Sequence, residues 1–299
     1  MHEKIFERSS WLAGEFERHR SRLHSVAYRM LGSLSDADDA LQETWLRVER
    51  SDADDIANPA GWLTTVTARV CLNMLRTRSN RHEEPIAPFV PDPIIQEEST
   101  GDPAFEAALA DSVGLAMLVV LQTLGPAERL AFILHDMFAV PFDEIASMLD
   151  RTPASVRQLA SRARTRVRSA PLATIDLVQQ RVVVDAFFAA ARAGDFDGLV
   201  AILDPNVRLC ADGGPSRAGI SAIVHGAETV AGRAIMFSVP DVTIRPVVVN
   251  GNAGIVAVSA DGEPISVMAF TISGNRVVAI DVLADPDRLR DLPGIQPSR

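Results

Sequence analysis

The chain has 299 residues, of which 47% are hydrophobic, and a formal net charge of −10. This composition is typical of a globular rather than a disordered chain, and the length favours two or three compact units. The apolar runs are too short for a membrane span and the charged N-terminus is unlike a signal peptide, so we expect a cytoplasmic protein that does not enter a membrane.

The two cysteines, Cys71 and Cys210, lie far apart, each in an apolar stretch. This number excludes a cysteine-rich zinc site and gives no support to a disulfide framework. We expect two buried free thiols, no metal site and no cofactor.

The first segment predicts a helix over residues 11–34, because its apolar residues recur close to a 3.6-residue period. A second helix is expected over residues 35–50, with Ser35 as its N-cap and Asp38 at the capping-box position. Leu41 and Trp45 begin its buried stripe, which continues to Val48. A third helix is expected to begin near Asn58 and Pro59 and to include "AGWLTTVTARVCLNMLRTR".

The composition changes at "EPIAPFVPDPIIQEESTGDP", which starts at Glu84 and contains five prolines in 20 residues. Proline removes backbone donors and disfavours helix in the preceding residue, so residues 85–103 are predicted to form an extended linker. Its apolar residues are unusual for a passive tether, and we expect them to lie against a surface. They are Ile86, Phe89, Val90, Ile94 and Ile95.

Helical patterns resume at Ala104 and continue to about Arg168, and they end in "FDEIASMLDRTPASVRQLASRARTRVR". This stretch predicts two helices joined by a tight turn, with Thr152 as the cap of the second and Pro153 in its first position. The expected buried positions are Phe142, Ile145, Ala146 and Leu149 in the first helix, and Val156, Ala160, Ala163 and Val167 in the second. The pattern is that of a helix-turn-helix.

The second of these helices has five arginines and no acid between Ala154 and Arg168. Salt screens charges beyond roughly 8–10 Å, so this local field and not the negative net charge decides contact with phosphate. Arginine pairs with guanine, glutamine with adenine, and serine with either base or phosphate. We expect this face to bind DNA; the alternative is a solvated surface helix. The residues assigned to the DNA face are Ser155, Arg157, Gln158, Ser161, Arg162 and Arg164, with Arg168 at its end.

After Pro171 two short helices, in "DLVQQRVVVDAFFAAARAG" and "FDGLVAIL", precede strand-like runs separated by turn residues. The runs are "NVRLCA", "DVTIRPVVV", "GIVAVSA", "PISVMAFTI" and "RVVAIDVL". Helices followed by strands predict an α+β domain with a curved antiparallel sheet over residues 171–299.

Two of these stretches resemble bacterial extracytoplasmic-function sigma factors. "SDADDALQETWLRV" with "GWLTTVTARVCLNMLRTR" is similar to their region 2, and "LQTLGPAERLAFILHDMFAVPFDEIASMLDRTPASVRQLASRARTRVR" to their region 4. The resemblance implies all-α regions at residues 1–84 and 104–170, joined by the linker. It also implies the partners: region 2 would bind the RNA polymerase core enzyme and open the −10 element, and region 4 would read the −35 element of promoter DNA.

The resemblance also implies roles for side chains of region 2. The residues expected to bind core polymerase are Asp38, Asp39, Gln42, Glu43 and Leu46. The residues expected at the −10 element are Asn58, Trp62, Arg69, Arg76 and Arg78. This chain departs from the family pattern at Leu159, where many members have a basic residue, and at Val70, which replaces a common asparagine.

The C-terminal part, with "LCADGGPSRA", "VVNGNAG" and "LADPDRLRDL", resembles the SnoaL-like domain of one subgroup of these factors. The resemblance implies a cone of helices on a curved sheet around an apolar pocket, and a domain that tunes the activity of the sigma factor. We expect this domain either to sense a small-molecule ligand or to serve purely as a docking domain, without catalysis. The polar groups expected at the pocket are Asp212, His225, Asp281 and Arg276. Two alternatives stay open: a helix-turn-helix regulator that works without polymerase, and a pocket enzyme in which an aspartate is the general base.

Overall fold

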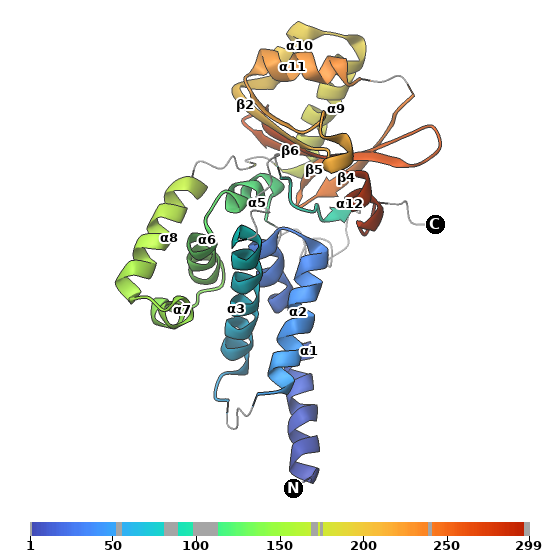
Figure 1. The fold of residues 1–299 in the computed structure, drawn as a ribbon. Helices are drawn as coiled ribbons and strands as arrows, with labels where there is room; N and C mark the ends of the chain where they lie inside the picture. Colours follow the sequence, from blue (N-terminus) through green and yellow to red (C-terminus); the bar gives the residue numbers. More distant parts are fainter. Residues whose placement is uncertain are drawn as a thin grey trace. The chain divides into compact units, whose positions relative to one another are not determined.

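The computed structural model describes residues 2–51, 56–80, 89–97, 113–168, 173, 176–238 and 241–295 (Figure 1). The chain forms two compact units. The first comprises Met1–Glu84 with Val120–Ser169, and the second comprises Pro85–Val119 with Ala170–Arg299. The residues that link the two helical segments in sequence therefore belong to the same unit as the C-terminal segment.

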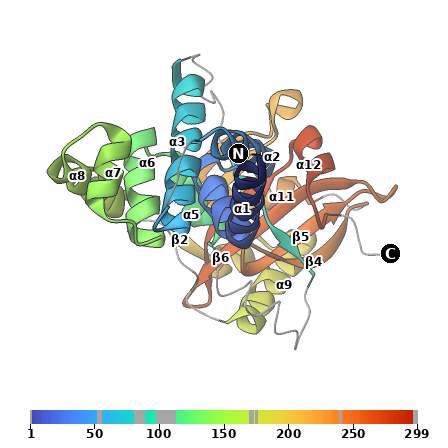
Figure 2. The same ribbon diagram turned by 90° about the horizontal axis from the view of Figure 1, so that it is seen from below.

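The N-terminal helices of the first unit are α1 (His2–Leu31), α2 (Leu34–Glu49) and α3 (Pro59–Asn80), which pack against one another (Figures 1 and 2). Apolar side chains at helical spacing, such as Leu23, Val26 and Met30 of α1, are removed from solvent in their core. The predicted helices are thus confirmed, and burial of their apolar stripes explains their stability better than propensity does.

The start of α2 differs from the prediction. Its N-cap is Ser33, whose hydroxyl oxygen accepts a hydrogen bond from the backbone N–H of Asp36 at 3.3 Å. Ser35 lies in the first turn with its hydroxyl 3.0 Å from that of Ser33, so the predicted N-cap was wrong by two residues, and Asp38 is not at the capping-box position. Trp45 is only half-buried and packs against Phe16, with ring centroids 5.3 Å apart.

The second helical segment contains α5 (Leu115–Gln122), α6 (Pro126–Phe132), the short π-helix η1 (Ile133–Met137), α7 (Phe142–Leu149) and α8 (Pro153–Val167). Asp150 ends α7 in the left-handed conformation with φ 53°, and the Thr152 hydroxyl accepts from the N–H of Ser155 at 3.2 Å. This turn and cap confirm the predicted helix-turn-helix. Leu159 is buried in its core, so this position does not belong to the exposed face of α8.

Arg129 of α6 joins the two helical segments of the first unit. Its guanidinium donates to the Met30 carbonyl of α1 at 2.7 Å and to the backbone carbonyls of Gln122 and Leu124. Burial lowers its pKa to about 10, and the nearby charge of Arg78 acts in the same direction. Several carbonyl acceptors offset the cost of burying this cation.

The second unit is built on a sheet with strand order β1-β4-β5-β6-β7-β2-β3, in which β2–β7 is parallel and the other pairs are antiparallel. The strands are β1 (Ile95–Gln96), β2 (Leu203–Asp212), β3 (Ala222–His225), β4 (Thr243–Val249), β5 (Asn252–Val258), β6 (Pro264–Ser273) and β7 (Arg276–Leu283). Asn250 and Gly251, both with positive φ, make the tight turn between β4 and β5 that "NGNAG" predicts. The α+β fold class is confirmed, with a mixed rather than fully antiparallel sheet.

The helices of this unit are α9 (Leu177–Ala193), α10 (Phe196–Ile202), α11 (Ala227–Met236) and α12 (Pro286–Asp291), with the short 3-10 helix η2 (Pro215–Arg217) after β2. Helices α9 and α11 contact one face of the sheet, and α12 contacts β6 (Figure 1). Phe187 and Phe188 of α9 meet Phe270 of β6 edge to face, with ring centroids 5.4 and 5.7 Å apart. These aromatic contacts fix the helix layer on the sheet.

The proline-rich linker lies on this unit. Its strand β1 pairs with the edge strand β4, with Ile95 opposite Val249, and Val90 and Ile95 are buried. The expectation that the apolar linker residues lie against a surface is confirmed for these two, whereas Ile94 is exposed and Ile86 lies outside the described residues. An edge strand of the sheet is therefore covered by the chain's own linker.

Candidate functional sites

The exposed face of α8 carries most of the side chains predicted to bind DNA. Arg157, Gln158, Ser161 and Arg162 are exposed, and Ser155 and Arg164 are half-buried. Thr152 and Pro153 start the helix, and burial of Val156, Ala160 and Ala163 directs the opposite face outward. The predicted residues are thus brought together on one helix surface.

Not all of these arginines are available in the same way. Glu128 of α6 accepts from Arg162 and from Arg166, both at 2.9 Å, and Asp136 accepts from Arg164 at 2.6 Å. Arg157 has no carboxylate partner among the described residues, and its guanidinium lies 5.6 Å from the ring centroid of Phe142. The charge of Arg157 is therefore not neutralised by a carboxylate of the described residues and is available to an external partner.

The exposed side of α2 carries the predicted polymerase-binding residues. Asp38, Asp39 and Gln42 are exposed, and Glu43 and Leu46 are half-buried. Glu43 pairs with Arg47 one turn later at 2.7 Å, and Asp38 lies 3.5 Å from the Nε2 atom of His24. A polar acidic surface with one partly exposed leucine at its margin suits a basic helical partner.

Helix α3 divides the residues predicted for the −10 element into two groups. Arg69 and Arg76 are exposed on one face of α3 and lie two turns apart. Trp62 is half-buried two turns before Arg69. Arg78 is instead ion-paired to Asp36 of α2 at 2.5 Å, and the Asn58 side-chain oxygen caps α3 by accepting from the N–H of Gly61 at 3.1 Å. Arg78 and Asn58 therefore have structural contacts of their own. Val70 is buried in the core, so the residue that departs from the family pattern there faces inward.

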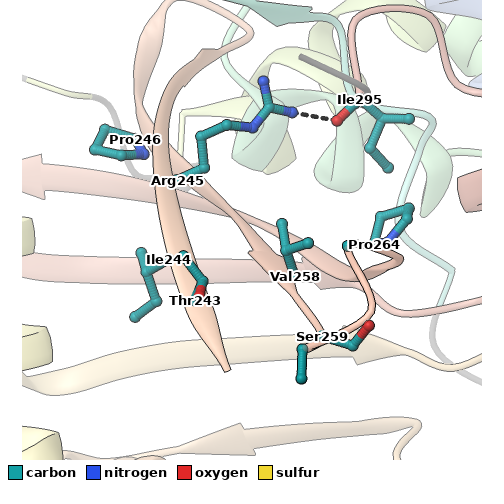
Figure 3. A pocket seen from close by; sticks show the side chains of 10 residues that line it. Thr243, Ile244, Arg245, Pro246, Val258, Ser259, Pro264 and Ile295 are labelled. Atoms are coloured by element: carbon teal, nitrogen blue, oxygen red, sulfur yellow. Dashed lines mark hydrogen bonds between the residues drawn. The ribbon is translucent and has the colours of Figure 1, made fainter. Parts of the chain in front are cut away.

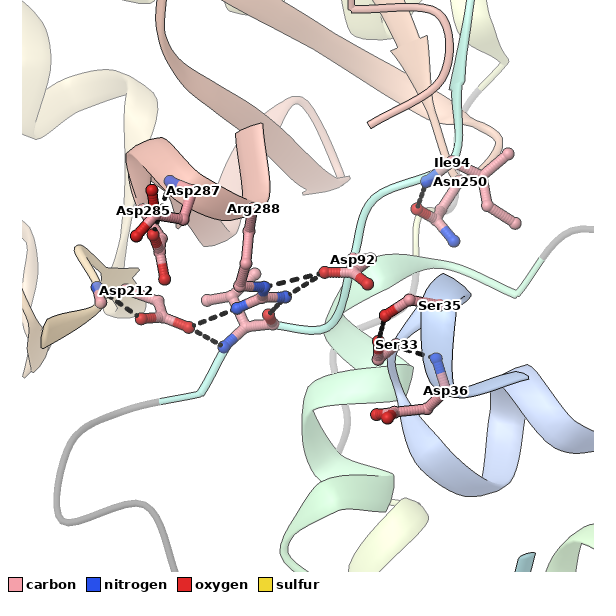
Figure 4. Close-up of polar contacts among 12 residues, drawn as sticks. Ser33, Ser35, Asp36, Asp92, Ile94, Asp212, Asn250, Asp285, Asp287 and Arg288 are labelled. Atoms are coloured by element: carbon pink, nitrogen blue, oxygen red, sulfur yellow. Dashed lines mark hydrogen bonds and ion pairs between the residues drawn. The ribbon is translucent and has the colours of Figure 1, made fainter. Parts of the chain in front are cut away.

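A buried cluster ties the linker to the C-terminal helix (Figure 4). We call it the Arg288 cluster, and it consists of Val90, Asp92, Asp212 and Arg288. The Arg288 guanidinium donates to Asp212 Oδ2 and Asp92 Oδ1, both at 2.8 Å, and to the Val90 carbonyl at 2.6 Å. Asp212 Oδ2 also accepts from the Val90 N–H at 3.1 Å. The stretches "DGGPSR", "ADPDRL" and "FVPDP" thus meet in one hydrogen-bond network.

A second attachment lies further along the linker. The side-chain oxygen of Asn250, in the β4–β5 turn, accepts from the N–H of Ile94 at 2.9 Å, and the Asn250 N–H donates to the Ile94 carbonyl at 2.9 Å (Figure 4). Its side-chain amide donates to the Val113 carbonyl at 3.3 Å. The sequence indicated only a turn at Asn250, because the residue that it binds in the linker is 156 residues away.

An apolar cavity of about 360 Å³ lies between the sheet and the helices α9 and α11. Its buried walls include Phe187, Leu209, Ile255 and Ile280. Its polar lining side chains are Arg192, Arg233, Ser238 and Ser266, and none of the described lining residues is an aspartate, glutamate or histidine. The cavity has the size of a small-molecule site and lacks a carboxylate or imidazole that could act as a general base.

The polar residues that the sequence assigned to this pocket are elsewhere, so that expectation was wrong. Successive strand residues point to opposite faces, and Leu209, Ala211, Ile280 and Val282 occupy the cavity side. Asp212 and Asp281 alternate with them and face the other side, where Asp212 belongs to the Arg288 cluster. His225 is exposed, and Arg276, also exposed, donates to the Leu203 carbonyl at 3.4 Å.

Asp281 is buried beside Arg208, whose guanidinium donates to its Oδ1 at 2.7 Å. Burial raises the pKa of Asp281, and the charge and hydrogen bond of Arg208 oppose that rise. Asp281 Oδ2 has no hydrogen-bond partner in the described part of the chain. This ion pair is internal to the sheet and does not reach the cavity.

A second hollow lies at the sheet edge near the C-terminal segment (Figure 3). It is lined by residues of β4, by the β5–β6 turn and by Ile295. Arg245 of β4 points across it and donates to the Ile295 carbonyl. Its guanidinium is therefore bound to the chain's own backbone.

No cluster of three or more histidine, cysteine or acidic side chains suited to a metal ion occurs among the described residues. None of the helices in the described ranges has the length and hydropathy needed to cross a lipid bilayer.

Comparison with known proteins identifies three domains in this chain. Residues 16–81 match Sigma-70 region 2, residues 115–167 match Sigma-70 region 4, and residues 184–287 match the SnoaL-like domain. The chain is 35% identical over 294 residues to the ECF RNA polymerase sigma factor SigJ of Mycobacterium tuberculosis, with 93% of each chain covered. It is 34% identical to the probable ECF RNA polymerase sigma factor SigI of the same species, with 94% of this chain and 96% of that one covered.

The crystal structure of M. tuberculosis SigJ is similar to the whole fold described above. The TM-score is 0.72, with 94% of this chain and 99% of that chain covered. The three domains therefore occur in the same order in a solved structure of a sigma factor.

Proposed function

The chain belongs to the ECF RNA polymerase sigma factors, and on that premise we propose which of its surfaces contacts the core polymerase and which contact promoter DNA. A sigma factor of this family acts with the RNA polymerase core enzyme and promoter DNA through regions 2 and 4. In region 4 the −35 contacts are centred on Arg157, with Gln158 and Ser161 beside it. The observation that carries this assignment is the exposed, acid-free face of α8 after Thr152.

Region 2 supplies the other two surfaces. Asp38, Asp39 and Gln42 of α2 contact a basic part of the core polymerase. Arg69 and Arg76 of α3 follow the phosphates of the opened −10 strand, since both are exposed on one face of the helix. Trp62, half-buried at the start of that face, is the aromatic side chain on which a base would stack.

The contact between regions 2 and 4 supports a closed state of the free factor. The −10 and −35 elements are separate segments of the promoter, so the two regions must each reach a different site on the DNA. Arg129 of region 4 donates to the Met30 carbonyl of region 2 at 2.7 Å, and Arg22 donates to the Phe138 carbonyl at 3.1 Å. We propose that these contacts open when the factor binds both elements of a promoter.

The C-terminal domain regulates the factor by holding the linker between the two regions. The Arg288 cluster and the Asn250 contacts fix residues 90–95 on the sheet, and β1 extends it. A linker bound at both points has less freedom to let region 4 move away from region 2. The cavity serves to bind a small-molecule ligand, since its described lining is apolar apart from two arginines and two serines.

In vitro transcription with core polymerase tests this function. We expect the full-length chain to direct specific initiation, and truncation after Arg168 to change the yield because the linker loses its binding surface. Equal transcription by the two chains would show that the C-terminal domain has no regulatory role. A polymerase-independent regulator is tested separately by core-polymerase pull-down, because such a protein would bind promoter DNA and leave polymerase behind.

A further inference from the structure

We infer that the cavity between α9, α11 and the sheet binds an apolar small molecule that ends in a single anionic group, such as a medium-chain carboxylate. The inference rests on the proposed binding role of this cavity and names the chemical class of its ligand. It follows from the separation of polar and apolar side chains along the cavity.

The inner part of the cavity is apolar. Phe187, Leu209, Ile255 and Ile280 are buried and line it together with Val282 and Met268. Burial of each methylene group of a ligand in such an environment raises its affinity about fourfold. The walls therefore favour a hydrocarbon or aromatic body over a polar one.

The charged end lies near solvent. Arg192 and Phe237 both line the cavity and are exposed, which places the opening at the C-terminal ends of α9 and α11. Arg233, in the last turn of α11, lines the same cavity and lies 5.6 Å from the Phe237 ring centroid. A molecule with its apolar part inside would present its other end to these two guanidiniums.

The charges at the opening favour an anion. Neither Arg192 nor Arg233 has a carboxylate partner among the described residues. Each helix C-terminus contributes about −0.5 of an elementary charge, so two helix ends offset about half of the two positive charges. The remaining positive charge and the planar donor groups of arginine suit a carboxylate.

Isothermal titration of the full-length chain with decanoate, decanol and decylamine, each below its micellar concentration, tests this inference. We expect decanoate to bind at least tenfold more tightly than the other two, since it alone gains charge-assisted hydrogen bonds. Arg192→Gln and Arg233→Gln should each remove most of that preference and leave decanol binding unchanged. Arg276→Gln, at an exposed arginine outside the cavity, is the matched control.

A second pair of variants shows whether the probe is inside the cavity. Ala257→Phe fills the cavity from β5 and should abolish binding of every probe, whereas Ala260→Phe, outside this cavity, should not. Equal binding of decanoate and decanol, decanoate binding that survives Ala257→Phe, or no binding by any probe would each overturn the inference. Each of these results leaves the linker's role open to the transcription assay, so failure of the ligand and failure of the proposed function are distinguishable.

Discussion

Arg288 and Asp212 are 76 residues apart in sequence, yet Arg288 Nη1 lies 2.8 Å from Asp212 Oδ2. The same carboxylate oxygen accepts from the Val90 N–H of the linker. One side chain thus binds both the C-terminal helix and the segment between regions 2 and 4. Whatever changes this ion pair also changes how firmly the linker is attached to the sheet.

We predict that Arg288→Ala releases the linker. The substitution leaves the buried carboxylates of Asp92 and Asp212 without their guanidinium. We expect the free energy of unfolding to fall by about 3 kcal/mol, which is the low end for a broken buried ion pair, because Arg288 keeps some solvent exposure. Hydrogen exchange of residues 89–97 should become much faster. Arg290→Ala in the same helix is the control, since Arg290 is exposed and, among the described residues, its one ion pair is with Asp287. Unchanged exchange in the Arg288 variant would contradict the role of the cluster.

Arg157→Ala should weaken binding of a −35 duplex by about 1–3 kcal/mol if Arg157 contacts a base. Arg162→Ala should have a smaller effect, because Arg162 shares Glu128 with Arg166 in the free protein. Titration of labelled duplex at fixed salt measures both. Affinity equal to the wild type for the Arg157 variant would remove it from the interface.

The ion pairs of Glu128 with Arg162 and Arg166 predict that another substitution strengthens DNA binding. Glu128→Gln removes the carboxylate that holds Arg162 and Arg166, so we expect tighter binding to any duplex and a steeper dependence of affinity on salt. Asp143→Gln on α7 is the comparison variant, because the side chain of Asp143 has no arginine partner among the described residues. A Glu128 variant with weaker binding would show that these pairs position the arginines for DNA.

In region 2, Arg69→Ala and Arg76→Ala should reduce binding to a forked −10 template while the free energy of unfolding stays within about 0.5 kcal/mol. Arg78→Ala should instead lower the stability of region 2, because it breaks the contact with Asp36. Urea unfolding alongside DNA binding separates the two effects. The assignment fails if Arg69 and Arg76 variants lose stability and bind normally.

Local signals were sufficient to predict the helix-turn-helix. Thr152, Pro153 and the apolar positions of α8 act within one or two turns, so their spacing in the sequence determines the cap and the buried stripe. The start of α2 shows the limit of such signals. Two serines compete for the same cap, and only the backbone geometry selects Ser33 over Ser35.

The site residues of the C-terminal domain could not be predicted in the same way. Whether Asp212 and Asp281 face the cavity depends on the strand register, and a shift by one residue reverses the answer. The attachment of Asp92 to Arg288 spans 196 residues, so no local pattern indicates it. The apolar linker residues indicated that a surface was needed, but only the fold shows which one.

Phe138→Ala should loosen the contact between regions 2 and 4. Arg22 and Arg29 of α1 lie 5.4 and 5.0 Å from the centroid of this half-buried ring, and such cation–π contacts contribute about 0.5–1 kcal/mol each at exposed sites. We expect a larger radius of gyration by small-angle scattering and stronger binding to a promoter carrying both elements. Phe196→Ala, at an exposed phenylalanine of α10, is the control. An unchanged radius and affinity would mean that this contact does not keep the regions together.

The reactivity of the two thiols tests whether the cores of both units exclude solvent. Burial is the largest cause that raises the pKa of Cys71 and of Cys210 from 9.0 to about 12. At pH 8 about one thiol in ten thousand is then ionised in the native chain, so iodoacetamide should label neither cysteine until the protein is unfolded.

Above pH 9 the unfolded chain loses these protons and the native chain keeps them. The unfolded state therefore binds fewer protons, and stability should fall as the pH rises from 9 towards 12. Cys71→Ala and Cys210→Ala should each remove part of that slope, measured by urea unfolding at several pH values. Rapid labelling of either cysteine in the native protein, located by mass spectrometry, would show that its core is open to solvent.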